Sequence, residues 1–183
     1  MSSDRLSHIV TRTGDDGSTG LADGSRIDKA SSRIAAIGSV DELNCQLGLL
    51  LAEPLPEAIR NDLLHTQHEL FELGGALAYP EHGAFPAAAV VRLDQLCVQY
   101  NAGLPPLREF ILPGGIRAAA LAQIARAIAR RAERDVVRLS REEAIPPSLT
   151  PYLNRLSDWL FMLARTLNRT ASQNEICWRG KYG

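Results

Sequence analysis

The chain has 183 residues, of which 45% are hydrophobic and 22% charged, with a net charge of −1 at pH 7. This length and composition are typical of one globular domain with a sizeable core. The near-neutral charge argues against a general attraction to nucleic acids or membranes. Three scattered cysteines argue against a disulfide framework and a zinc site. We expect a cytoplasmic protein, because no apolar run approaches the ~20 residues that span a bilayer.

The first segment that stands out is TRTGDDGSTGLADGSR (11–26), which is rich in glycine, threonine and serine. Glycines allow the backbone to turn its N–H groups toward an anion, and the hydroxyl groups add donors. The segment lacks the Gly-Lys-Ser/Thr of a Walker A loop and does not lie between a strand and a helix. An anion-binding cradle and a disordered tail both remain open from these residues alone.

The rest of the chain has apolar residues at intervals of three and four, which predicts amphipathic helices. Proline- and glycine-rich connections divide it into five helices, expected at residues 32–53, 56–79, 87–103, 117–141 and 150–172. Thr150 and Pro151 are suited to cap and open the fifth helix. No strand pair stands out. The pattern therefore predicts one all-α domain (1–183), an up-and-down five-helix bundle at 31–175 preceded by an extended segment at 1–30.

The expected fourth helix, LAQIARAIARRAERDVVRL, separates its apolar and basic residues. The arc expected to face the core contains Leu121, Ile124, Ile128, Ala132 and Leu139. A different arc carries Arg126, Arg130 and Arg134, with Glu133 beside them. Like charges at i, i+4 and i+8 repel, whereas three aligned guanidiniums are suited to binding a polyphosphate. A solvated basic face is the alternative.

Two other helices carry polar residues in unusual places. Asp41, in SVDELN, falls at the edge of an apolar arc, where a carboxylate needs a partner and arginine is the usual one. Its neighbour Glu42 points away and is expected to be solvated. On the fifth helix, Asn154 could donate to a ligand or simply bond to Asp158 one turn later.

A metal site is the remaining alternative at the level of single motifs. In HTQHELFE, four side chains share one helical face: His65, His68, Glu69 and Glu72. Di-iron bundles use a Glu-x-x-His pair on each of two helices, and this chain contains no such pair. A wet polar face is therefore favoured over a metal site.

Taken in order, four motifs resemble the PduO-type ATP:cob(I)alamin adenosyltransferases: TRTGDDGSTGLADGSRIDKASSR, SVDELN, RRAER and YLNRLSDWLF. The segment FILPGG is similar to the corrinoid-facing loop of that family. The resemblance covers almost the whole chain, from about Ile9 to Trp178. It implies a helical-bundle homotrimer that binds ATP at the seam between two subunits.

The resemblance also assigns roles to individual residues. The nucleotide would be wrapped from one subunit by Thr11, Arg12, Thr13, Gly14, Thr19, Gly20 and Lys29. It would be met from the neighbouring subunit by Arg130, Arg131, Glu133, Arg134 and Asn154. Asp41 would pair with Arg126 across the interface. Phe110 would press on the face of the cobalamin where the lower axial ligand otherwise sits.

The reaction implied is attack of Co(I) on the 5′-carbon of ATP, which forms adenosylcobalamin and releases triphosphate. Mg2+ would bridge the phosphates, with no protein ligand assigned, and Co(II) would be bound four-coordinate so that it can be reduced. We also expect a flavin reductase and an adenosylcobalamin-dependent enzyme as partners. The competing hypotheses are a nucleic-acid-binding bundle, against which the lack of aromatics among the arginines argues, and a di-iron oxidoreductase.

Overall fold

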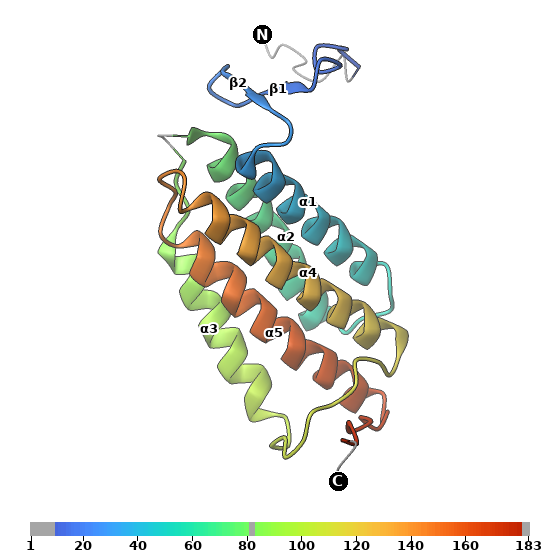
Figure 1. Cartoon of the computed structure of the whole chain (residues 1–183). Helices are drawn as coiled ribbons and strands as arrows, with labels where there is room; N and C mark the ends of the chain where they lie inside the picture. Colours follow the sequence, from blue (N-terminus) through green and yellow to red (C-terminus); the bar gives the residue numbers. More distant parts are fainter. Residues whose placement is uncertain (1–9, 81–82, 181–183) are drawn as a thin grey trace.

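The computed structural model describes residues 10–80 and 83–180. Over these residues the secondary-structure elements are β1 (Ser18–Gly20), β2 (Arg26–Asp28), α1 (Ser32–Leu51), α2 (Glu57–Ala78), α3 (Ala87–Ala102), α4 (Arg117–Leu139) and α5 (Leu149–Thr170). The five helices run alternately up and down, and the two strands lie beyond the end of the bundle at which α1 begins (Figure 1). The predicted all-α up-and-down bundle is confirmed, and each helix begins and ends within two residues of its expected position.

The helices pack in a fixed order. α1 lies against α2 and α4, α4 lies against α5, and α5 lies against α3. Leucines from all five helices fill the core, and the largest fully buried side chains are Trp159 and Tyr152 of α5. Each buried leucine contributes about 1.5–3 kcal/mol relative to an exposed one, so the interleaved apolar stripes hold the bundle together.

Helix α4 differs in detail from the arc expected to face the core. Ile124 is 49% exposed, and the buried face is built largely from small residues: Ala118, Ala119, Ala122, Ala125, Ala129 and Ala132. Small side chains allow helices to approach closely, and α4 packs against both α1 and α5. The prediction that Ile124 lies in the core was wrong. The prediction followed the large apolar side chains, whereas the face of α4 that packs against α1 and α5 is formed mainly by alanines.

The start of α5 also differs from the expectation. The helix begins at Leu149, Ser148 is the capping residue, and no side chain caps the first turn. Thr150 therefore lies inside the helix. Instead of capping, the Ser148 hydroxyl donates to the carbonyl of Phe85, which ties the start of α5 to the segment before α3 (2.7 Å).

The expectation of no strand pair was wrong. β1 and β2 pair antiparallel, with Thr19 opposite Ile27. Gly24 adopts a φ of +86° in the connecting turn, and Asp23 Oδ1 accepts hydrogen bonds from the N–H and hydroxyl of Ser25. Three-residue strands are too short to show an alternating pattern, so the turn chemistry was the available signal. Ala22 N–H donates to the carbonyl of Ala78 (2.9 Å), which attaches the hairpin to α2.

Within the described residues, α1 is the one helix long and apolar enough to cross a membrane by length and composition. Its leucines at positions 43, 47 and 50 are completely buried inside the bundle. The core between α2 and α4 therefore accounts for the apolar character of α1.

Candidate active site

The glycine-rich segment is folded around one lysine. Lys29 Nζ donates to the carbonyl of Gly14 (2.6 Å), and a Cβ added at Gly14 would lie 2.9 Å from this ammonium nitrogen. Thr11 and Thr13 share a hydrogen bond between their hydroxyls (2.9 Å). Arg26 donates to the carbonyl of Thr13 and to the hydroxyl of Ser18 (3.0 Å from Nε). The segment is therefore an organised loop and hairpin, and the disordered-tail alternative does not describe it.

Backbone conformation supports an unusual role for this loop. Arg12 has a φ of +58°, in the left-handed region that residues other than glycine seldom adopt. Asp16 is engaged by the N–H and hydroxyl of Ser18, and these hydrogen bonds lower the pKa of its carboxyl. The side chain of Arg12 is exposed. The loop thus exposes the Arg12 guanidinium from a backbone in the left-handed region.

A cleft of about 650 Å³ lies where the hairpin meets α1 and α2. It is lined by three of the predicted nucleotide-binding residues, Thr19, Gly20 and Lys29, and also by Asp41. The remaining lining is largely apolar and includes Phe71, which is 75% exposed. The side chain of Asp41 makes no hydrogen bond or ion pair within residues 10–80 and 83–180. The structure therefore brings Asp41 to the same cleft as the hairpin residues and leaves its carboxylate available.

The arginines of α4 are not equivalent. Arg126 is half-buried and its Nε donates to Gln123 Oε1 (2.7 Å). Burial, and then the charge of Arg130, lower the pKa of Arg126. Arg130 and Arg134 are exposed, and their side chains make no hydrogen bond or ion pair with any part of the chain that the structure describes. The guanidiniums of Arg130 and Arg134 repel each other, and an anion bound between them would relieve this repulsion.

Arg131 points elsewhere. It forms an ion pair with Glu42 of α1, so the expectation that Glu42 is merely solvated was wrong. Glu42 and Arg131 lie on facing helices, and Glu42 directly follows Asp41, which lines the cleft. Within one chain, Arg131 is thus turned toward α1 and is held by a carboxylate.

Glu133 and Asn154 form a second contact between helices. Asn154 Nδ2 donates to Glu133 Oε1 (3.2 Å), and Asn154 Oδ1 accepts from Arg155 (2.8 Å). The alternative bond from Asn154 to Asp158 is not formed. Asn154 and Glu133 therefore lie together beside the arginines of α4, as one polar group on the surface of the bundle.

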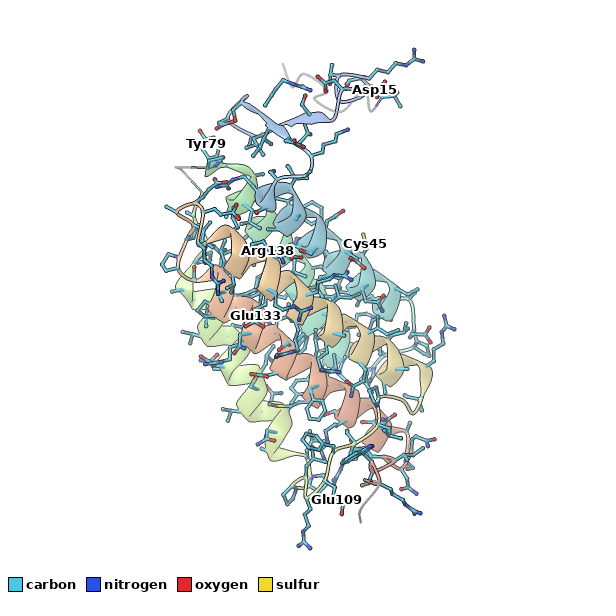
Figure 2. All side chains as sticks on the ribbon, viewed as in Figure 1. Asp15, Cys45, Tyr79, Glu109, Glu133 and Arg138 are labelled. Carbon is cyan, nitrogen blue, oxygen red and sulfur yellow. The ribbon has the colours of Figure 1, made fainter. Side chains whose placement is uncertain are left out.

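Phe110 lies in the loop between α3 and α4 and is 80% exposed. Its neighbour Glu109 marks one end of the molecule, Asp15 marks the opposite end, and Glu133 lies between them (Figure 2). α4 has 23 residues, so at 1.5 Å per residue it separates the two ends by roughly 35 Å. One chain thus presents its candidate residues in three separate places: the hairpin, the middle of α4 and the distal loop.

The possible metal face on α2 is organised by other contacts. Glu69 Oε1 accepts from Arg92 Nε (2.8 Å) and lies 3.3 Å from His65 Nε2, and Glu69 Oε2 accepts from the hydroxyl of Tyr152 (2.9 Å). No group of three or more histidines, cysteines, aspartates or glutamates in the described chain could hold a metal ion. Glu69 is instead a buried structural carboxylate that joins α2, α3 and α5.

Comparison with known proteins identifies the family. The model of the family described as cobalamin adenosyltransferase matches residues 9–167. The chain belongs to the cobalamin adenosyltransferase family. It is 56% identical to a cobalamin adenosyltransferase of Cupriavidus metallidurans over 96% of both chains, and 43% identical to a corrinoid adenosyltransferase of Bacillus subtilis over 92% of this chain and 90% of that one.

Solved structures agree with this assignment. A phenylalanine-to-alanine variant of the PduO-type ATP:corrinoid adenosyltransferase from Lactobacillus reuteri, complexed with cobalamin and ATP, superposes with a TM-score of 0.91 at 34% identity. The match covers 94% of this chain and all of that one. An arginine-to-lysine variant of the same enzyme, complexed with ATP, has a TM-score of 0.89. The chain is accordingly a PduO-type transferase enzyme, as the ordered motifs predicted.

Sequence reasoning missed the residues that support the Phe110 loop. Asn168 and Arg165 of α5 are both buried, and both bond to backbone carbonyls of the segment between α3 and α4. Their burial is visible only in the structure, and buried polar groups of this kind require hydrogen-bond partners.

Proposed function

We propose that this enzyme transfers the 5′-deoxyadenosyl group of ATP to the cobalt of cob(I)alamin, at a site shared by two subunits of a homotrimer. The observation that carries the shared site is the separation of the candidate residues within one chain. The hairpin and Phe110 lie at opposite ends of a bundle whose α4 is about 35 Å long. ATP and a corrinoid that must touch each other cannot bridge that distance, whereas a neighbouring chain can bring its α4 and its loop to the hairpin.

Asp41 and Arg126 provide the contact across the seam. The Asp41 carboxylate lines the cleft below the hairpin and has no partner in its own chain over the described residues. Arg126 uses one guanidinium nitrogen for Gln123 and keeps others for a second partner. Exposed Ile124, on the same helix, supplies an apolar surface that assembly would cover. Pairing Asp41 with Arg126 of the neighbour would place the hairpin against the arginines of α4.

The chemistry consists of positioning and charge stabilisation. Co(I) is itself a strong nucleophile: its electron pair forms the Co–C bond to C5′, the C5′–O bond breaks, and triphosphate leaves with that bonding pair. Lys29 and the backbone of the loop at Gly14 would hold the triphosphate from one chain. Arg130 and Arg134 would stabilise its growing charge from the other, in the manner of an oxyanion site.

A divalent cation fits this scheme as a companion of the nucleotide. No acidic or histidine cluster in the described chain could form a cage for it, and Asp16 is already engaged by Ser18. Mg2+ usually keeps several waters and binds through substrate phosphates, so it would be held by the triphosphate and would neutralise part of its charge.

Phe110 has the second task, which concerns the cobalt before the transfer. Co(II) with an axial ligand is hard to reduce, and an apolar ring in the axial position would exclude that ligand and leave Co(II) four-coordinate. Phe110 is 80% exposed, so its ring is available to a corrinoid that docks against the loop of the chain that also supplies the α4 arginines. A flavin reductase would supply the electron, and an adenosylcobalamin-dependent enzyme would receive the product, in the cytoplasm.

The test is incubation of the protein with ATP and chemically reduced cobalamin while the visible spectrum is recorded. Formation of the Co–C product together with stoichiometric triphosphate supports the proposal. Conversion without triphosphate release, or no conversion, would overturn it.

A further inference from the structure

The loop that carries Phe110 needs support from elsewhere in the fold. It connects the end of α3 at Ala102 to the start of α4 at Arg117. Phe110 is 80% exposed and Leu112 is 47% exposed, so burial of these side chains cannot hold the loop in one conformation. An exposed ring that must occupy one position on a substrate requires a backbone that is fixed by other contacts.

Asn168 fixes the end of the loop nearest α4. This side chain is 6% exposed; its Nδ2 donates to the carbonyl of Gly114 (3.1 Å) and its Oδ1 accepts from the N–H of Ile116 (3.0 Å). Gly115, between them, has a φ of +103°, and a Cβ there would lie 2.0 Å from Asn168 Oδ1. The amide of Asn168 therefore occupies the space that glycine leaves and serves both backbone groups beside it.

The segment after α5 fixes the middle of the loop. Leu112 N–H donates to the carbonyl of Ile176 (2.8 Å), and Trp178 N–H donates to the carbonyl of Phe110 itself (2.7 Å). Ile111 and Cys177 form an antiparallel bridge between these hydrogen bonds. The backbone of residues 110–112 is thus paired with residues 176–178 through one antiparallel bridge.

Arg165 connects the segment after α5 to the beginning of the loop. It is 5% exposed, its Nε lies 3.0 Å from Glu175 Oε1, and its NH2 group donates to the carbonyl of Pro105 (2.9 Å). Arg165 and Asn168 are one turn apart on α5. From this one turn they hold the beginning and the end of the loop and the segment that pairs with its middle.

We propose that Asn168 and the Arg165–Glu175 pair are positioning residues that hold Phe110 where it excludes the axial ligand of the corrinoid. This inference rests on the proposed function of Phe110. Neither group lines the cleft below the hairpin, and both contact the loop backbone. They therefore serve the reduction of Co(II) and have no direct part in ATP binding or in attack by Co(I).

The first test compares Asn168→Ala with a control, Gln173→Ala, whose exposed side chain bonds, among the described residues, only to the carbonyl of Asn174 (3.5 Å). Adenosylation is started either from Co(II)alamin with a weak reductant or from chemically reduced Co(I). We expect Asn168→Ala to lose on the order of tenfold or more from Co(II), as for misplacement of a positioned group, and less than about threefold from Co(I). The control should match the wild type in both assays.

A spectroscopic readout separates positioning from simple loss of structure. The electron paramagnetic resonance spectrum of bound Co(II) reports its axial ligand. Asn168→Ala with ATP should show a larger five-coordinate fraction than the wild type, with an unchanged KM for ATP. Equal losses from Co(II) and Co(I), or a wild-type spectrum, would overturn the positioning role.

Glu175→Gln is the second variant, because it keeps the shape of the side chain and removes only the charge that faces Arg165. We expect the same Co(II)-specific loss, smaller than for Asn168→Ala. A double variant, Phe110→Ala with Asn168→Ala, should lose no more than Phe110→Ala alone, because both changes act through one ring. Additive losses would contradict this.

The outcomes also distinguish the two levels of the account. If Phe110→Ala shows no Co(II)-specific loss, the proposed role of Phe110 fails. If Phe110→Ala shows that loss and both Asn168→Ala and Glu175→Gln behave as the control does, the positioning role alone fails.

Discussion

Glu42 of α1 and Arg131 of α4 form an ion pair within one chain. Arg130, the residue before Arg131, has no such partner among the residues that the structure describes. Two adjacent arginines that carry the same charge therefore stand in different surroundings. Arg131 is partly neutralised by its own chain, and Arg130 keeps its hydrogen-bonding capacity, which in the proposed site would serve the triphosphate.

This difference predicts unequal effects of two matched substitutions. Arg130→Ala should lower kcat/KM for ATP roughly 30- to 1000-fold, because a charged donor is lost from the reacting anion. This corresponds to a loss of about 2–4 kcal/mol of transition-state stabilisation. Arg131→Ala, at an exposed ion pair, should cost less than about 1 kcal/mol of stability and far less activity than Arg130→Ala. Steady-state kinetics at saturating cobalamin measure both. A normal kcat/KM in Arg130→Ala would restore the solvated-face interpretation of the arginines.

Phe110→Ala should separate the two tasks of the site. We expect ATP affinity to stay nearly unchanged, because in the proposed site the nucleotide would be held by the hairpin and α4. Activity should collapse when the assay starts from Co(II)alamin and a weak reductant, and should largely recover when Co(I) is supplied. A pure packing role would produce equal losses in both assays and a lower melting temperature.

Substitution of Glu69 should lower the stability of the fold without acting on the catalytic step. Glu69→Ala would leave Arg92 and the hydroxyl of buried Tyr152 without their acceptor, at a cost of about 3 kcal/mol for a broken buried pair. Glu72→Ala, at an exposed position on the same helix, is the control and should change stability by less than about 0.5 kcal/mol. Urea unfolding measures both. If the two variants unfold at the same urea concentration, Glu69 is not the structural carboxylate described above.

The three cysteines should differ in their rates of alkylation. Burial raises the pKa of the Cys97 thiol to about 11, so at pH 8 it holds less of the reactive thiolate than an ordinary cysteine, and its reaction should accelerate only as the pH approaches that value. Cys177 is exposed and should react first. Cys45, exposed in one chain and one helical turn beyond Asp41, should be protected by assembly and become reactive on dilution to monomers. Mass spectrometry of iodoacetamide-treated protein gives the order, and fast labelling of Cys45 in the trimer would place the seam elsewhere.

The helices could be predicted from the sequence because leucines recur every three or four residues along each of them, and this spacing reflects the burial that stabilises them. The β1–β2 hairpin could not, since strands of three residues show no alternation. Ile124 was assigned to the core because the helical pattern was read from large apolar side chains. The buried face of α4 is formed mainly by alanines instead.

The candidate site was predictable only in part. The motifs around Lys29, Asp41, Arg130 and Phe110 indicated an ATP and corrinoid site through their resemblance to a family. The ion pair between Glu42 and Arg131 and the anchoring of the Phe110 loop by Asn168 join residues more than fifty positions apart. Such contacts follow from how the helices pack, which periodicity alone does not specify.

The measurement that tests the central claim most directly is complementation between two inactive variants. Lys29→Ala damages the hairpin half of the site, and Arg130→Ala damages the α4 half. When the two are unfolded together and re-assembled in equal amounts, random mixing in a cyclic trimer restores about one seam in four, so roughly a quarter of wild-type activity should return. Each variant refolded alone, and a chain carrying both substitutions, should stay inactive. If the mixed trimers form and remain as inactive as the single variants, the site is not shared between subunits.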